Sequence, residues 1–248
     1  MRCVHRISAV FVALSLMIAA ADSFASGLNA KKKKTGIPVV RWTDGSPDST
    51  LVKGTDGIYR YTLSYETASV TVAIDSQELE KTRRTLEHVF RVVLTVRNRG
   101  TLPFDVEPQK MTLELADHFH VLLRSEDPDD LAARIQDDSD ELVHQSEREL
   151  KKYPERRAVV EARLREHEKV VAQWQEYLSA KTLRGMTLDP GQAEVTGLVF
   201  FPTRTKWTGD WKKEEHLILR LPIVKVVFEF PFTLPPPGEV PQLRERSD

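Results

Sequence analysis

The sequence predicts a mainly β protein in which a long helical insertion interrupts an antiparallel β-sandwich. Apolar and polar residues alternate in the segments before residue 127 and after residue 182, as they do in half-buried strands. Between these segments, residues 128–181 contain 23 charged side chains among 54 and no glycine. Such a stretch is typical of solvated helices. The 248 residues carry a formal net charge of −1, which gives no indication of nucleic-acid binding.

The first 25 residues have the pattern of a secretory signal peptide. Two arginines precede an apolar run over 7–21, and small residues follow it at the end of the segment 1–25. A retained membrane anchor is the alternative, but the run is short for a span. We therefore expect an extracytoplasmic protein, periplasmic or secreted, without an integral membrane span after cleavage. Cys3 is the only cysteine and lies before the run, so no disulfide is expected.

Residues 26–50 are predicted to form a flexible basic segment, with lysines at 31–34 and a short strand over 37–42. We interpret the lysines as a solvated tail; attraction to anionic lipid or cell-wall polymer is the alternative.

The first part of the sandwich is predicted over residues 51–127. Its central strand begins near Glu87 and ends at a turn where Asn98 and Gly100 tolerate positive φ. Pro103 marks the next segment as an edge or a crossing between sheets, because proline cannot donate to a ladder. The apolar residues expected on inner faces are Tyr59, Tyr61, Leu63, Tyr65, Val70, Val72, Ile74, Phe90, Val92, Leu94, Val96, Met111, Leu113 and Leu115.

The segment TVRNRGTLPFDVEPQKMTLEL (95–115), taken with TLDPGQAEVTGLVFF (187–201), resembles the immunoglobulin-like sandwich modules of secreted bacterial proteins of unknown function. The resemblance covers about residues 86–123 and 182–232. It implies a fold and an extracytoplasmic location, and it brings no catalytic residues.

Residues 128–181 are predicted to form a charged helical hairpin, with helices over 129–152 and 154–181. Asp127 suits the N-cap and Pro128 the first turn, whereas Pro154 breaks the pattern between the helices. A single rod kinked at Pro154 is the alternative, and the sequence leaves both open.

The second helix carries a heptad seam, in which residues recur at alternating steps of four and three. We interpret the seam as a surface that the first helix, the sandwich or another molecule covers. Within the seam, the imidazole of His167 could act as a pH-sensitive latch, or it could simply pack with its polar edge in solvent. The predicted partner-binding residues are Val160, Leu164, His167, Val171, Trp174 and Leu178.

The second part of the sandwich is predicted over 182–233, followed by a proline-rich, charged tail over 234–248. Within this part, the loop after Pro202 contains two tryptophans among basic residues, a combination that suits sugar rings or anionic polymers. The alternative is that the tryptophans pack on one end of the sandwich. The predicted ligand-binding residues are Arg204, Lys206, Trp207, Trp211 and Lys212.

The nearest approach to a metal site is His118-x-His120, which on a strand would place two imidazoles on one face. Its third ligand would have to come from His88 or His216, and two histidines at a strand edge are the commoner arrangement. No Gly-x-Ser-x-Gly nucleophile elbow, phosphate-binding glycine-rich loop or cysteine nucleophile is apparent in the sequence.

The favoured hypothesis is therefore a non-catalytic extracytoplasmic module without a cofactor, whose helical hairpin and sandwich rim bind a partner protein. The alternatives are a carbohydrate- or envelope-binding module through Trp207 and Trp211, and a metal-binding protein or metalloenzyme through His118 and His120.

Overall fold

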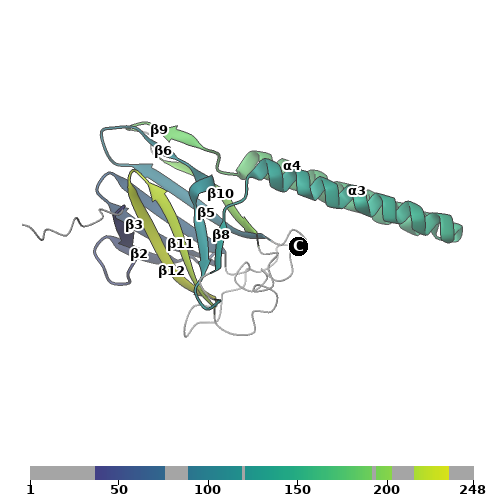
Figure 1. Cartoon of the computed structure of the whole chain (residues 1–248), viewed down its shortest axis with the longest axis horizontal. Coiled ribbons are helices and arrows are strands. Elements are labelled where there is room, and N and C mark those ends of the chain that lie inside the picture. Colours follow the sequence, from purple (N-terminus) through teal and green to yellow (C-terminus); the bar gives the residue numbers. More distant parts are fainter. Residues whose placement is uncertain (1–36, 76–88, 119–120, 192–193, 203–214, 235–248) are drawn as a thin grey trace, which may run out of the picture. The chain divides into compact units, whose positions relative to one another are not determined.

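The computed structural model describes residues 37–75, 89–118, 121–191, 194–202 and 215–234 (Figure 1), all within a compact unit that begins at Ile37. These residues are mainly β, as predicted, and a two-helix insertion interrupts the strands. The segments predicted as signal peptide (1–25) and lysine cluster (31–34) lie outside the described residues.

Two five-stranded sheets make up most of the β part, and we call them sheets A and B. In sheet A the order is β1 (Val39–Arg41), β12 (Val226–Leu234), β11 (Glu215–Ile223), β7 (Thr112–Leu115) and β8 (Val121–Arg124). In sheet B it is β10 (Val195–Pro202), β5 (Val89–Asn98), β4 (Ala68–Asp75), β3 (Ile58–Tyr65) and β2 (Ser49–Lys53). Neighbouring strands are antiparallel except for β1 and β12, which are parallel.

The two sheets share one hydrophobic core, to which each contributes every second residue of its strands. The predicted central strand is β5, and its alternation is confirmed, because Phe90, Val92, Leu94 and Val96 are all at most 1% exposed. Phe201 on β10 and Phe230 on β12 complete the middle of this core.

The chain crosses between the sheets after β5 by way of a small two-stranded sheet, β6 (Phe104–Val106) with β9 (Met186–Leu188). The predicted crossing is therefore present, but its turn works differently from the expectation. Neither Asn98 nor Gly100 has a positive φ. Instead, the Asn98 amide donates to the carbonyls of Leu102 and Leu188, both at 2.9 Å, and its oxygen accepts from the Gly100 amide at 2.9 Å.

The short strand predicted at 37–42 is β1. It pairs with β12, and Trp42, which follows it, is buried in the core. Residues 39–42 thus belong to the sheets, although the sequence placed them in a flexible segment reaching to residue 50. Strand β2, which begins at Ser49, crosses that predicted boundary as well.

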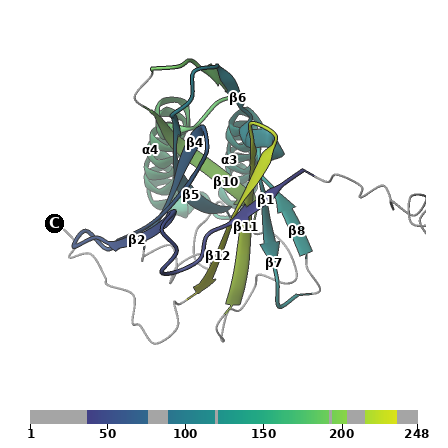
Figure 2. The same ribbon diagram turned by 90° about the vertical axis from the view of Figure 1, so that its left-hand side faces the viewer.

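The insertion consists of α3 (Pro128–Lys152), a 3₁₀ turn η2 (Pro154–Arg156) and α4 (Arg157–Lys181). The Asp127 side chain accepts from the Asp129 amide at 2.8 Å, so Asp127 is the predicted N-cap. Figures 1 and 2 show the two helices side by side. We call residues 128–181 the helical pair.

A cluster of alternating charges crosses the outer face of sheet A. Arg220 on β11 forms ion pairs with Glu114 on β7 and, at 2.8 Å, with Glu229 on β12. Glu229 also accepts from Arg41 on β1 at 2.5 Å. Both carboxylates are buried, so each requires its charged partner.

Candidate functional site

The apolar seam of α4 is covered by α3. Hydrogen bonds between side chains join the helices: His167 Nε2 with Ser139 Oγ at 3.1 Å, Arg163 with Ser146 Oγ at 3.1 Å and with the Glu149 carboxylate at 2.9 Å, and Gln175 Nε2 with the side-chain oxygen of Gln136 at 2.9 Å. Residues near the end of α3 therefore meet the start of α4, so the helices are antiparallel and a single kinked rod is excluded. Two of the three buried residues of α3 are serines, at 139 and 146, so the face of α3 that meets this seam is less apolar than the seam itself.

The predicted partner-binding residues are thus wholly or partly covered within the molecule, and a role for them in binding stays a prediction. Val160, Val171 and Leu178 are buried, and Leu164, His167 and Trp174 are half-buried. A partner that approaches from outside would meet other residues of the helical pair first.

The base of the helical pair is fixed on the outer face of sheet B. Leu131 and Leu178 form a second hydrophobic core with Val89, Leu198 and Phe200 of β5 and β10. Trp174 packs at its margin, with its ring centroid 6.0 Å from the guanidinium carbon of Arg91. This shared core restrains the pair at its base, because tilting the pair would expose apolar surface.

Both ends of the helical pair also bond to the same strand. The Glu126 amide donates to the Phe200 carbonyl at 2.8 Å, and the Leu183 amide donates to the Leu198 carbonyl at 2.9 Å. These carbonyls belong to β10, the edge strand of sheet B. The entry and the exit of the insertion are therefore anchored two residues apart.

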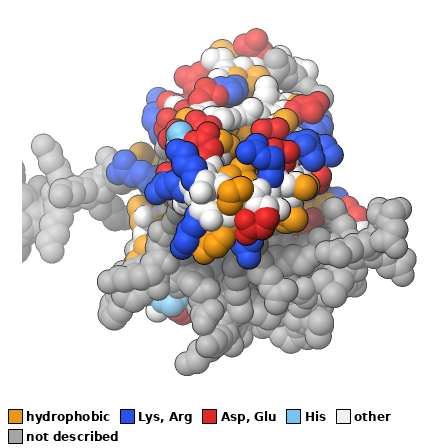
Figure 3. Space-filling model, turned by 90° about the vertical axis from the view of Figure 1, so that its right-hand side faces the viewer, with side chains coloured by type: hydrophobic (Ala, Val, Ile, Leu, Met, Phe, Trp, Pro, Cys, Tyr) orange, Lys and Arg blue, Asp and Glu red, His pale blue; other side chains and the backbone are white. Residues whose placement is uncertain are grey.

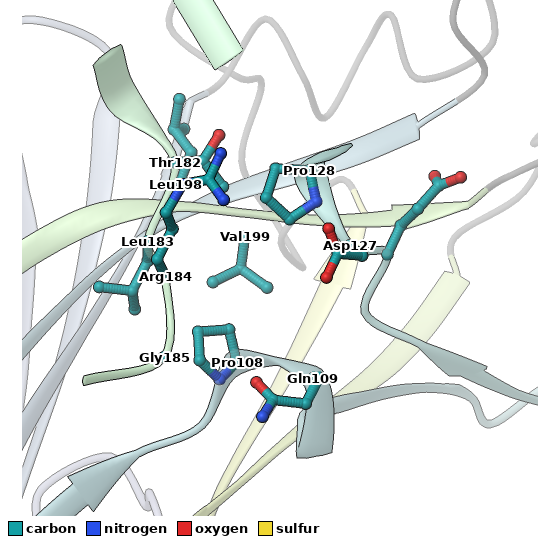
Figure 4. Close-up of a pocket in the computed structure, with 11 residues that line it drawn as sticks. Pro108, Gln109, Asp127, Pro128, Thr182, Leu183, Arg184, Gly185, Leu198 and Val199 are labelled. Atoms are coloured by element: carbon teal, nitrogen blue, oxygen red, sulfur yellow. The ribbon is translucent and has the colours of Figure 1, made fainter. Parts of the chain in front are cut away.

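A small pocket of about 100 Å³ lies between this entry and exit (Figure 4). Residues 182–185 line one side, and Asp127 and Pro128 line the other. Thr182 Oγ1 is buried and, among the described residues, has no hydrogen-bond partner. A pocket of this size with an unpaired hydroxyl suits ordered water rather than a substrate.

An ion pair joins the first turn of α3 to the segment that follows α4. The Asp129 carboxylate accepts from the Arg184 guanidinium at 2.7 and 3.0 Å. These hydrogen bonds lower the pKa of Asp129 and raise that of Arg184. Both side chains are more than half exposed, so the pair contributes little to stability.

The tip of the helical pair exposes apolar and basic groups together. Tyr153 is 39% exposed and Val159 is 73% exposed. The Lys152 ammonium and the Arg156 guanidinium each lie 5.2 Å from the centroid of the Tyr153 ring. Figure 3, which views the molecule from this end, shows hydrophobic atoms near the centre with Lys and Arg side chains close by.

Glu149 and Glu161 near the tip form ion pairs with arginines of the insertion, whereas Glu155 in η2 is exposed. Glu149 accepts from Arg163 at 2.9 Å and from Arg156 at 3.4 Å, and the Arg163 hydrogen bond is the largest cause of the lowered pKa of Glu149. Lys151, Lys152 and Arg157 lie in the same turn region, and all three are exposed. Residues 149–163 contain five basic and three acidic side chains, so the tip has an excess of positive charge.

The alternative metal site at His118 and His120 is only partly described. His118 lies in a turn between β7 and β8 and not on a strand, and His120 lies outside the described residues. The Asp117 carboxylate accepts from the His216 amide at 2.8 Å and contacts its ring nitrogen Nδ1 at 2.9 Å. The backbone hydrogen bond is the main cause of the lowered pKa of Asp117. The described ranges contain no group of three or more metal-ligating side chains.

The predicted ligand-binding loop with Arg204, Lys206, Trp207, Trp211 and Lys212 lies outside the described residues, and so does the tail over 235–248. A role for the loop in binding stays a prediction.

Comparisons of the chain with protein families, curated proteins and solved structures found no match. The resemblance to immunoglobulin-like modules therefore also stays a prediction. No helix in the described residues is long and apolar enough to cross a membrane.

Proposed function

We propose that the protein is a non-catalytic extracytoplasmic interaction module that binds a partner protein through the tip of its helical pair. The observation that carries this proposal is the contrast between the two ends of the pair. Its base is buried in a core shared with sheet B, whereas its tip exposes Tyr153 and Val159 among basic side chains.

The arrangement suits binding at a distance from the sheets. Each helix has 25 residues, which corresponds to about 37 Å at 1.5 Å per residue. The covered seam and the fixed base hold the tip in one orientation before any partner arrives. A preorganised surface loses less conformational entropy on binding than a flexible one.

The side chains of the tip indicate the chemistry of the partner. Tyrosine and arginine are enriched among the residues that contribute most to protein–protein affinity. The cations Lys151, Lys152, Arg156 and Arg157 surround the Tyr153 ring or adjoin it in sequence. We therefore propose that the partner offers an acidic surface with an apolar centre, because charges of opposite sign speed and orient association.

The β part would then serve as the support of the helical pair. We propose that sheets A and B form a sandwich that is immunoglobulin-like in architecture and not in exact topology. Sheet B contains four consecutive strands, β2 to β5, whereas immunoglobulin domains divide their consecutive strands differently between the sheets.

Site-specific photocrosslinking in the cells that produce the protein tests the proposal. A photoreactive phenylalanine analogue replaces Val159 at the tip, and in a second variant it replaces Leu102, which is 75% exposed on the β part. We expect one discrete crosslinked protein from the tip position, which should vanish when Lys151, Lys152 and Arg156 are all changed to Glu.

The matched control reverses the charge of Arg165 and Lys169, which are exposed on α4 away from the tip. This variant should keep the crosslink. The proposal is wrong if Val159 gives no discrete product, or if both charge reversals weaken the product equally.

A further inference from the structure

A second cavity lies on the side of the β part that is opposite the anchored ends of the helical pair. Edge strands β8 and β10 border the anchored side, whereas β1 and β2 are the edges of the other side. Strand β1 pairs only with residues 227–229 of β12, so the last residues of β12 have no neighbour from β1. The cavity, of about 570 Å³, lies beside this uncovered end.

The walls of the cavity are mainly apolar and include one tryptophan, two tyrosines and one phenylalanine, and we call it the aromatic groove. Its aromatic and aliphatic lining consists chiefly of Trp42, Leu51, Tyr59, Tyr61, Leu217 and Phe232. The rings contact one another: Trp42 meets Tyr61 edge to face at a centroid distance of 5.1 Å, and Phe232 lies 6.3 Å from Tyr61. The groove has the volume and the lining of a small-molecule site.

Two phenolic hydroxyls provide the polar groups of the aromatic groove. Tyr59 and Tyr61 lie on the same face of β3, two residues apart. Neither hydroxyl has a hydrogen-bond partner within the described ranges, in contrast to the Trp42 indole, which donates to the Thr50 carbonyl at 3.2 Å. Both side chains line the groove, although they are only 4% and 7% exposed.

The charges at the rim do not favour an ionic ligand. One acidic residue, Asp44, and one basic residue, Lys53, line the groove together with His216, which already contacts Asp117. Burial raises the pKa of Tyr61 to about 12, so its hydroxyl is a neutral hydrogen-bond donor at physiological pH. An uncharged ligand with an oxygen acceptor would satisfy these donors without the burial of a charge.

We infer that the aromatic groove binds an uncharged, largely apolar small molecule whose carbonyl or hydroxyl oxygen accepts hydrogen bonds from Tyr59 and Tyr61. This inference is independent of the proposed function, because the groove and the tip of the helical pair share no residue.

A fluorescent neutral ketone, 6-propionyl-2-(dimethylamino)naphthalene, serves as the probe. Its emission shifts to the blue in apolar surroundings, so titration of the full chain measures saturable binding. A second probe has the same naphthalene body with the ketone reduced to a methylene group. Comparison of the two separates apolar contact from hydrogen bonding to the oxygen.

Two variants test the two parts of the inference. Tyr59→Phe with Tyr61→Phe should weaken the ketone about tenfold and leave the carbonyl-free probe within about twofold, because only hydrogen bonds are removed. Leu51→Trp fills the groove from β2 and should abolish the binding of both probes. Circular dichroism and urea unfolding confirm that each variant is folded.

The matched control is Val52→Trp, which places the same indole on the same strand at a residue that is 54% exposed and does not line the groove. It should bind both probes as the unaltered chain does. The inference is overturned if the unaltered chain gives no saturable blue shift, if Leu51→Trp binds as well as Val52→Trp, or if the double phenylalanine variant weakens both probes equally.

Discussion

Gly197 lies directly against the backbone of Leu183, and a methyl group on Gly197 would come within 2.7 Å of both the nitrogen and the Cα of Leu183. Leu183 is the residue through which the exit of the helical pair bonds to β10. We expect Gly197→Ala to destabilise the fold by about 1–3 kcal/mol, because the obstacle is backbone and cannot rotate away. Urea unfolding measures the loss. Gly185→Ala is the control, because its nearest neighbours would be 3.8 Å away or more. Equal stability of the two variants would contradict this expectation.

Asn98 should contribute far more to the free energy of unfolding than its position in a turn suggests. Asn98→Ala removes two hydrogen bonds to carbonyls and one from an amide, and it leaves the carbonyl of the buried Leu188 without this donor. We expect a loss of roughly 2–4 kcal/mol in thermal or urea unfolding. Thr187→Ala, which removes one exposed hydrogen bond to Asp105, should change stability by less than about 1 kcal/mol. A loss below 1 kcal/mol for Asn98→Ala would show that water replaces its bonds.

Arg220→Met should destabilise the protein by roughly 3 kcal/mol, because it leaves the buried carboxylates of Glu114 and Glu229 without their shared cation. A triple variant with Arg220→Met, Glu114→Gln and Glu229→Gln should regain part of the lost free energy of unfolding. The control is Arg60→Met, whose partner Asp56 is 44% exposed, and its effect should stay below about 1 kcal/mol. If the triple variant is as unstable as the single one, the pairing of charges is not the cause.

Tyr61 should make the free energy of unfolding depend on pH in the alkaline range. Burial raises its pKa to about 12, and Tyr59 adds to the rise. Because the raised pKa belongs to the folded state, the contribution is complete below pH 10 and is lost as the pH rises from about 10 to 12. Unfolding of Tyr61→Phe should therefore vary less with pH over this interval. Ultraviolet titration of the unaltered chain should show one late tyrosine that the variant lacks; identical titrations would contradict the assignment.

A shortened helical pair should remain folded. Replacing residues 143–163 by a short Gly-Ser turn keeps the base, including Leu131, Leu178 and the His167–Ser139 contact. We expect a similar midpoint of urea unfolding and the loss of the tip crosslink, since the base core is unchanged. Removal of all of 128–181 should instead lower solubility, because it uncovers Leu198 and Phe200. Equal behaviour of the two deletions would mean that the base does not stabilise sheet B.

The elements of this fold could be predicted where one periodicity dominates. Strand β5 alternates apolar and polar residues over its length, and α3 and α4 have a cap, a proline break and a heptad seam that together set their bounds. Strand β2 was not predicted, because edge strands need little apolar alternation and only Ser49 of its five residues is buried.

Contacts between distant segments could not be predicted in the same way. The heptad seam of α4 gave no indication of its partner, because the facing positions of α3 include Ser139 and Ser146, which pack against His167 and Arg163 and not against apolar residues. The aromatic groove joins Trp42, Tyr61 and Phe232, which are up to 190 residues apart and come together only through sheet pairing. Of these three residues, only Tyr61 was expected on an inner face from the sequence, and no local pattern shows that a core is open at one side.

The anchoring of both ends of the helical pair on β10 has a consequence for the behaviour of the chain in crowded solution. An uncovered edge strand has free amides and carbonyls, and a strand of another molecule can pair with them to form a shared sheet. Here the Glu126 and Leu183 amides already occupy the Phe200 and Leu198 carbonyls. The insertion thus protects this edge strand against self-association, and a partner that binds the tip of the helical pair need not disturb that protection.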